Sequence, residues 1–221
     1  SDYLAQVHRQ RGVSLELGRS VQALIGRDGQ VEAVQLDDGR LLACDLVVLG
    51  VGVLPDVALA QAAGIACDNG ILVDAFGRTS APRVLAAGDA TNMLLPLPDG
   101  RLERLRLESI QAANDGARAA ASVVVGRPQA VNAVPWFWSE QHDLKLQMAG
   151  LPAEGDQAVV RGEMASGRFT VFYLRDSAVV AAHSVNRPAE HMLARKLIAQ
   201  RAHIPAAVLV NPDAQLKAFA P

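Results

Sequence analysis

An uninterrupted apolar run at residues 46–49 limits the fold more than any other feature of this sequence. A strand with one solvent-facing side alternates apolar and polar residues, whereas a strand covered on both faces is apolar throughout. Strands covered on both faces are typical of parallel sheets, which need helices on either side. We therefore expect residues 46–49 to form a buried strand of a parallel sheet in an α/β protein.

Changes in hydrophobic period divide the rest of the chain into short helices and strands. Helices are expected at residues 1–11, 56–63, 109–125 and 188–202. Strands are expected at residues 13–17, 21–25, 31–36, 41–43, 71–73 and 84–86 and, after a shift in composition at Pro135, at residues 144–148, 159–163, 169–174 and 179–183. The helix at 109–125 has the clearest ends, because Ser109 can cap it and Gly126 follows it. The last third of the chain is thus expected to form a separate α+β unit.

Composition excludes several classes of function. The chain has 221 residues, half of them hydrophobic, which suffices for one large domain or two small ones. Its formal charge of −2 provides no basic field for holding nucleic acid or an anionic membrane. No apolar stretch approaches the ~20 residues that span a bilayer, and the first residues lack the pattern of a secretory signal. We expect a cytoplasmic protein that binds neither nucleic acid nor membrane.

Cysteine and histidine carry no metal or dithiol signal. The two cysteines, Cys44 and Cys67, lie far apart in sequence and form no Cys-x-x-Cys pair. His142 and His183 stand alone, without the spacing of metal ligands, and are interpreted as structural. We therefore expect reduced thiols and no metal site.

Two glycines follow the apolar run directly. A Gly-x-Gly-x-x-Gly turn after a strand would hold a pyrophosphate at the N-terminus of a helix. Gly50 and Gly52 supply the first two positions, but Pro55 occupies the third, so the fingerprint fails. A tight backbone turn beside the end of a strand explains the two glycines as well as a ligand-facing turn does.

Three phrases in register resemble a signature of the two-dinucleotide flavin reductases: residues 46–56, 70–74 and 84–90. The resemblance implies that Gly50 and Gly52 lie near cofactor and that Asp89 hydrogen-bonds a ribityl hydroxyl of FAD. A short carboxylate can accept such a bond, and the glycine before it, Gly88, removes a side chain that would block the approach. Alone, Gly-Asp is also ordinary turn chemistry.

Residues 106–111 resemble the segment of that family that leads into a helix pointing at the pyrimidine ring of the flavin. The resemblance implies that Glu108, Ser109 and Ile110 border FAD, Ile110 through its backbone. A helix N-terminus offers unpaired N–H groups and partial positive charge, which favour negative charge at N1 and O2 of the reduced ring. The alternative is a capped surface helix whose dipole Glu108 complements.

Residues 134–145, which contain both tryptophans, closely resemble the start of the C-terminal domain in bacterial ferredoxin reductases serving Rieske-type dioxygenases and cytochromes P450. The resemblance implies that Trp138 lies near the flavin edge, where a large aromatic shields the ring from water on the path to the docked iron-sulfur protein. By composition alone, Trp136 and Trp138 would instead be core anchors of a new domain.

The resemblance implies an enzyme of the pyridine nucleotide-disulfide oxidoreductase superfamily that moves electrons from NADH through FAD to a [2Fe-2S] ferredoxin. Arg118 and Lys145 are candidates for docking an acidic ferredoxin, although single basic residues are commonly just solvated. The implied fold comprises the rear parts of two glutathione-reductase-like dinucleotide-binding domains, then an α+β reductase domain. The implied bounds are 1–52 for NAD, 53–134 for FAD and 135–221 for the C-terminal domain.

The flavin carries the chemistry in such enzymes, so no catalytic acid, base or nucleophile is expected of the protein. The family has two Gly-x-Gly-x-x-Gly turns, and neither occurs in these 221 residues. We therefore expect the isolated chain to hold neither nucleotide tightly and to have little reductase activity. Two alternatives stay open: a non-catalytic C-terminal interaction module, and another FAD- and NAD-linked reductase of the same superfamily.

Overall fold

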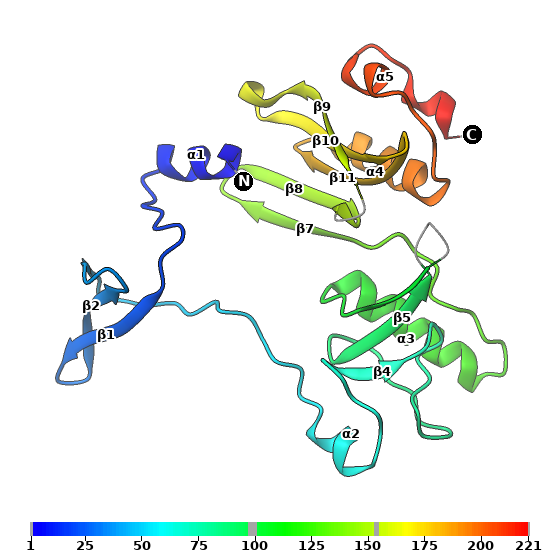
Figure 1. The fold of residues 1–221 in the computed structure, drawn as a ribbon, viewed down its shortest axis with the longest axis horizontal. Helices are drawn as coiled ribbons and strands as arrows, with labels where there is room; N and C mark the ends of the chain where they lie inside the picture. Colours follow the sequence, from blue (N-terminus) through cyan, green and yellow to red (C-terminus); the bar gives the residue numbers. More distant parts are fainter. Residues whose placement is uncertain (1, 97–100, 153–154, 221) are drawn as a thin grey trace. The chain divides into compact units, whose positions relative to one another are not determined.

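Two compact units make up the chain, Ser1–Val53 and Leu54–Pro221. The computed structural model describes residues 2–96, 101–152 and 155–220 (Figure 1). Helices and strands occur in both units, and the expected mixed α/β class is confirmed.

Unit one contains a helix followed by an antiparallel meander. Its elements are α1 (Asp2–Gln10), β1 (Val21–Arg27), β2 (Gln30–Leu36) and β3 (Leu41–Ala43), with the sheet order β1-β2-β3. Asp28 and Gly29 connect β1 to β2 with φ angles of 51° and 80°, the left-handed backbone that tight hairpin turns require. The predicted helix and these strands are confirmed, except that Ser1 lies outside the described residues.

Two predictions for unit one are wrong. Residues 13–17 form no strand, and Leu17 is 72% exposed. Residues 46–49 also form no strand, and Leu46 and Val48 are 77% and 85% exposed. A strand exists only where a neighbour pairs its backbone N–H and C=O groups, and no described strand lies alongside either segment. The apolar content of residues 46–49 therefore indicated burial, but a strand forms only where a neighbouring strand pairs with its backbone.

Unit two begins with a small mixed sheet and a long helix. Its elements are α2 (Ala58–Ala62), β4 (Ile71–Val73), β5 (Thr91–Pro96), β6 (Leu102–Leu105) and α3 (Ile110–Val124). β4 and β5 pair in parallel, with Val73 opposite Met93, and β5 and β6 pair antiparallel. Val73, Met93 and Leu95 form the core of this part. The strand expected at residues 84–86 is wrong, because only Leu85 makes a single bridge, to Arg78.

The predicted ends of α3 are confirmed. Ser109 precedes the helix in an extended conformation, and its hydroxyl oxygen accepts the N–H of Ala112 at 3.1 Å. Gly126 follows with a φ of 72°. Inside the helix, Gly116 lies against β5: a Cβ there would be 3.7 Å from the methyl carbon of Met93. The helix is thus anchored at its start and packed closely at its centre.

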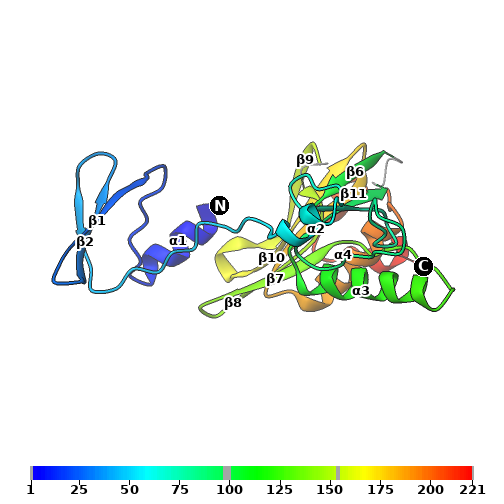
Figure 2. The same cartoon turned by 90° about the horizontal axis from the view of Figure 1, so that it is seen from below.

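The rest of unit two is an antiparallel sheet backed by a helix (Figures 1 and 2). The five-stranded sheet has the order β7-β8-β11-β10-β9, and α4 packs against β11 and β8. Phe172, Leu174 and Leu197 are among its fully buried core residues. The elements are β7 (Trp136–Gln141), β8 (Leu144–Gly150), β9 (Gln157–Glu163), a 3₁₀ turn (Met164–Ser166), β10 (Arg168–Arg175), β11 (Ala178–Val185), α4 (Pro188–Ala199), α5 (Ala206–Val210) and a last 3₁₀ turn (Leu216–Phe219). The α+β architecture is confirmed, with β8 to β11 and α4 where they were predicted, whereas β7 and α5 were not predicted and this part shares one compact unit with residues 54–134.

A buried ion pair connects this sheet to its helix. Arg161 on β9 and Glu190 on α4 are 5% and 9% exposed, and Arg161 Nε donates to Glu190 Oε1 at 2.7 Å. The other carboxylate oxygen, Oε2, accepts the hydroxyl of Thr170 on β10 at 2.6 Å. The guanidinium also donates to backbone carbonyls that hold the C-terminal segment in place, those of Leu209, Asn211, Pro212 and Ala214.

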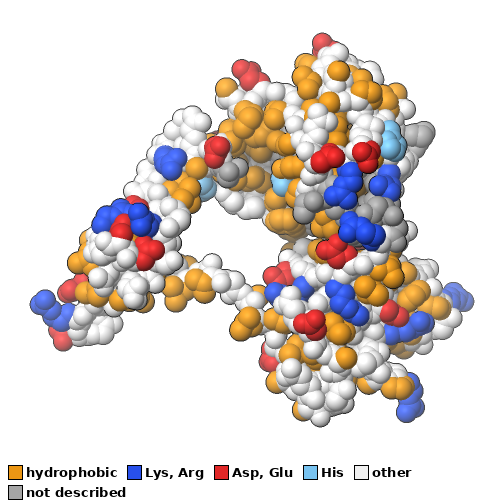
Figure 3. Space-filling view, in the orientation of Figure 1, with side chains coloured by type: hydrophobic (Ala, Val, Ile, Leu, Met, Phe, Trp, Pro, Cys, Tyr) orange, Lys and Arg blue, Asp and Glu red, His pale blue; other side chains and the backbone are white. Residues whose placement is uncertain are grey.

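Charged side chains of both signs are spread over the surface. On the face that Figure 3 shows, basic and acidic side chains are interspersed, in line with the small net charge. Among the helices that the structure describes, none combines the length and the apolar character needed to cross a bilayer.

Replacing Arg161 with methionine should lower the free energy of unfolding by about 3 kcal/mol, because the buried Glu190 then keeps only the partly exposed Arg187, 3.1 Å from its Oε1, as a cationic partner. Urea denaturation measures the loss. The double variant R161M/E190Q should recover part of it, since the charge it leaves unpaired, Arg187, is partly exposed, and the exposed control R127M should change stability by less than about 0.5 kcal/mol. A loss below about 1 kcal/mol in R161M would contradict this account.

Candidate functional site

A hollow of about 360 Å³ lies in unit two where three segments meet. These segments are the turn before β5, the start of α3, and β7. Most of the predicted cofactor-binding residues lie on its wall. The lining residues are Asp89, Glu108, Ser109, Ile110, Ala113, Phe137 and Trp138.

The start of α3 supplies the polar wall. Ser109 and Ile110 line the hollow, so the positive end of the helix dipole lies at its edge. The Ser109 hydroxyl accepts the N–H of Ala112. The backbone N–H groups before Ala112 have no acceptor within the helix, so they can donate to a ligand at the helix start. Glu108 pairs with Arg106 just before the helix. The carboxylate of Glu108 is therefore part of a local ion pair at this wall.

Aromatic side chains supply another part of the wall. Phe137 and Trp138 are 51% and 40% exposed, which is unusual for large side chains that serve only a core. Trp138 lies against Trp136, with ring centroids 5.6 Å apart and planes tilted by 30°. Trp136 is supported from α4, where the Arg195 guanidinium lies 4.8 Å from its ring centroid and the His191 ring 5.7 Å away.

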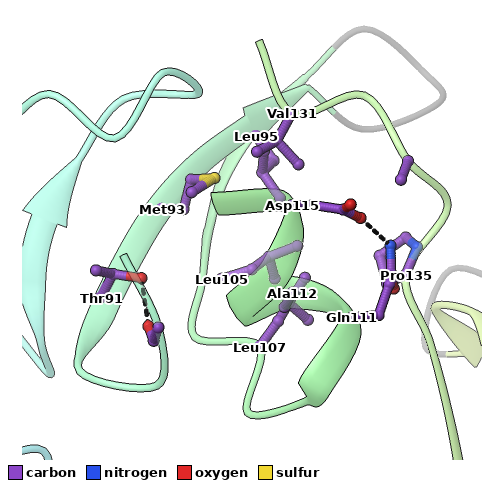
Figure 4. A pocket seen from close by; sticks show the side chains of 12 residues that line it. Thr91, Met93, Leu95, Leu105, Leu107, Gln111, Ala112, Asp115, Val131 and Pro135 are labelled. Atoms are coloured by element: carbon purple, nitrogen blue, oxygen red, sulfur yellow. Dashed lines mark hydrogen bonds between the residues drawn. The ribbon is translucent and has the colours of Figure 1, made fainter. Parts of the chain in front are cut away.

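Gly88 and Asp89 form the turn before β5. Gly88 has a φ of 93°, and its carbonyl accepts the N–H and the hydroxyl of Thr91 at 3.0 and 2.7 Å (Figure 4). A Cβ on Gly88 would meet no atom within 4 Å, so the turn requires glycine for its backbone angle and the adjacent space is open. Gly88 lines a separate apolar cavity of about 30 Å³, while the exposed Asp89 faces the hollow.

The remaining predicted residues lie outside the hollow. Gly50 and Gly52 belong to unit one, where Gly52 has a φ of 92° and residues 50–57 form neither helix nor strand. Arg118 on α3 has an 82% exposed side chain and pairs with Asp115 at 3.6 Å. Lys145 is exposed on β8. Within unit two, the structure thus brings together the flavin-side predictions but not the predicted docking residues.

Sequence reasoning missed His191 and Phe137. His191 is 1% exposed, and within the described part of the chain neither ring nitrogen has a hydrogen-bond partner. Burial, assisted by the nearby Arg195, lowers the pKa of His191 to about 4. A lone histidine in a helix carries no sequence signal for such a position. Phe137 could have been identified, because it stands between the two tryptophans.

The walls of the hollow suit one kind of ligand. Aromatic side chains favour a flat ring system, the positive helix end favours an electron-rich edge, and the Asp89 carboxylate can accept hydrogen bonds from hydroxyl groups. Among the described residues, no group of three or more His, Cys, Asp or Glu side chains is arranged to hold a metal ion. The chemistry therefore fits a planar, hydroxylated organic cofactor.

Comparison with known proteins finds two family models. One, described as pyridine nucleotide-disulphide oxidoreductase, matches residues 1–117, and one described as reductase C-terminal matches residues 136–220. A probable ferredoxin reductase of Castellaniella defragrans is 40% identical over 220 residues, which are 100% of this chain and 53% of that protein. The chain thus spans about half the length of the curated relatives it matches.

Solved structures share the fold. The ferredoxin reductase for the CYP199A2 system from Rhodopseudomonas palustris has a TM-score of 0.92 and 36% identity, covering 100% of this chain and 54% of that one. The covalent putidaredoxin reductase–putidaredoxin complex has a TM-score of 0.91 and 35% identity, covering 99% of this chain and 52% of that one.

Stability should fall in acid through His191. In the unfolded chain its pKa is near 6.5, so protonation favours unfolding: the contribution is present above that pH and is lost as the pH falls toward about 4. The loss amounts to at most about 3 kcal/mol. Urea denaturation at neutral pH and in acid should show a smaller loss for H191L than for wild type, with exposed H203Q as control. An equal loss in H191L would contradict this origin.

Proposed function

This chain belongs to the pyridine nucleotide-disulphide oxidoreductase family, and on that premise we propose that it is the C-terminal half of an FAD-dependent ferredoxin reductase. The observation that carries the proposal is the hollow, where the helix start at Ser109, the Asp89 carboxylate and the Trp138 ring meet. The match of residues 136–220 to a reductase C-terminal model supports the same assignment.

FAD fits the residues that are present. Asp89 would accept a hydrogen bond from a ribityl hydroxyl, the backbone at Ser109 and Ile110 would lie toward the pyrimidine edge, and Trp138 would cover the ring. When bound, FAD supplies the acceptance of hydride from NADH and the release of single electrons. Gly88 shapes the turn that presents Asp89, and its open surroundings leave room for a ligand.

The protein's own residues then have three tasks. The positive end of α3 stabilises negative charge at the ring edge. Phe137 and Trp138 exclude water from the ring while leaving a short distance to the surface. Asp89 orients the cofactor chain. None of these tasks requires a side chain to exchange a proton.

The wider assignment extends the same proposal. Residues 1–52 would end the NAD-binding domain, with Gly50 and Gly52 near its junction with residues 53–134 of the FAD-binding domain, and residues 135–221 would form the C-terminal domain. The boundary between the two compact units at Val53 supports the first division. We place the enzyme in the cytoplasm, where NADH is available.

A small [2Fe-2S] ferredoxin is the proposed partner. The related putidaredoxin reductase has been solved in a covalent complex with putidaredoxin. Arg118 and Lys145 are exposed cations on α3 and β8, and guanidinium and ammonium groups pair with the carboxylates of an acidic surface. They are the proposed docking residues of this chain.

Flavin content tests the proposal. The purified 221-residue chain should lack the visible absorbance of stoichiometric FAD, whereas the full-length protein from the same reading frame should contain it and reduce ferredoxin with NADH. In the full-length protein D89N should weaken FAD binding about tenfold, a loss of one charge-assisted hydrogen bond. The turn variant D28N is the matched control, because asparagine also accepts the backbone angle of Asp28.

Two results would contradict parts of this account. Stoichiometric FAD in the isolated chain would overturn the expectation that its site needs a further segment. A full-length protein that binds ferredoxin, yet neither contains flavin nor oxidises NADH, would instead establish a non-catalytic interaction module.

A further inference from the structure

Gln111 joins the first turn of α3 to the first residue of β7. Its side-chain oxygen Oε1 accepts the backbone N–H of Trp136 at 2.9 Å. Its side-chain nitrogen Nε2 donates to Asp115 Oδ2 one turn along the helix, at 2.6 Å (Figure 4). One amide group therefore connects the two elements that supply Ser109, Ile110, Phe137 and Trp138 to the wall of the hollow.

The two partners determine which way the amide points. A backbone N–H can only donate, and an ionised carboxylate can only accept. Gln111 must therefore direct its oxygen to Trp136 and its nitrogen to Asp115. A glutamate at this position could serve Trp136 but would set a second carboxylate against Asp115, and like charges at this spacing repel. Arg118, 3.6 Å from Asp115 Oδ1 and 82% exposed, offsets this repulsion only in part.

The position of Trp136 determines that of Trp138. Alternate residues of a strand lie on the same face, and the two tryptophan rings are 5.6 Å apart. In the register of β7 with β8, Trp136 lies opposite Ala149 and Trp138 lies opposite Gln147. Both tryptophans belong to one paired strand, so a shift of the Trp136 backbone also shifts Trp138. Holding the Trp136 backbone against α3 therefore sets the distance between the Trp138 ring and the helix start.

We propose that Gln111, oriented by Asp115, is a positioning residue that holds Trp138 at the hollow and thereby supports electron transfer to the partner. The geometric part stands independently, and the part about electron transfer rests on the proposed function. Gln111 itself does not line the hollow, so it acts through Trp136.

An exchange of donor and acceptor tests the geometric part. Q111E should disrupt the hydrogen bonds that join Trp136, position 111 and Asp115. D115N should preserve them, because asparagine keeps an oxygen that can accept the N–H of Gln111. The double variant Q111E/D115N should restore it, because the amide introduced at position 115 then donates to the carboxylate introduced at position 111. Q129E, at an exposed position after the same helix, is the matched control.

The tryptophan pair provides the readout. The chain has two tryptophans, and at 5.6 Å their transitions couple and produce a paired circular-dichroism band that W136F or W138F would identify. Q111E should lose most of this band, while D115N, Q111E/D115N and Q129E keep it. An unchanged band in Q111E would overturn the proposal, as would a folded double variant without it.

Kinetics of the full-length holoprotein test the functional part. We compare NADH-driven reduction of ferredoxin with that of ferricyanide, which takes electrons directly from flavin. Q111E should lower the ratio of the ferredoxin rate to the ferricyanide rate about tenfold, because small displacements strongly slow transfer. The double variant should restore the ratio to that of D115N, the reference that shares its loss of the carboxylate paired with Arg118. Equal loss of both rates would overturn the positioning role. A wild-type protein without flavin would instead refute the proposed function and leave the band test standing.

Discussion

The buried ion pair between Arg161 and Glu190 links the five-stranded sheet of unit two to the site. It connects β9, β10 and α4, and Arg161 also holds the carbonyls of the last segment. The residue after Glu190 is His191, whose ring lies against Trp136, and Arg195 stacks on the same indole one turn later. The pair thus positions the helix on which the aromatic wall rests. Compared with well-packed apolar residues, a buried ion pair contributes little to the free energy of unfolding, although removing one partner is costly. The directed hydrogen bonds of Arg161 and Glu190 favour one arrangement of these elements.

From Trp136 the arrangement continues to the hollow. The indole of Trp136 packs on Trp138, and its backbone N–H is held from α3 by Gln111. α3 is in turn packed at Gly116 against Met93 of β5, the strand that follows Asp89. The walls of the site therefore belong to one packed body in which each wall is positioned by the next.

Local chemistry made part of this predictable. The cap at Ser109, the hairpin at Asp28 and Gly29, and the alternating strands β8 to β11 each depend on neighbours within a few residues. The strand expected at residues 46–49 failed because pairing depends on a distant partner strand. β5 and β6 escaped prediction because their residues show no clear alternation. Arg161, a single basic residue in a strand, gave no hint of burial, since its partners lie at Glu190 and beyond.

The residues of the site also fall into two groups, those that a local motif predicts and those that no motif marks. Asp89, Ser109, Ile110 and Trp138 stood in motifs, and the structure places them around one hollow. Gln111 and His191 matter through contacts with Trp136, which is far away in the sequence, and Asp115 matters through Gln111, so no motif marks them. Gly50 and Gly52 were assigned from a motif that assumed a strand before them, and that strand does not form here.

The distance between Trp138 and flavin is the most direct measure of whether this hollow is the FAD site. A flavin in contact with an indole quenches the fluorescence of the indole. Subtracting the emission of the W138F full-length protein from that of the wild type isolates the emission of Trp138. Time-resolved fluorescence should show a strongly shortened Trp138 lifetime with FAD bound and a recovered lifetime after the flavin is removed. The same Trp138 lifetime with and without FAD would contradict the account.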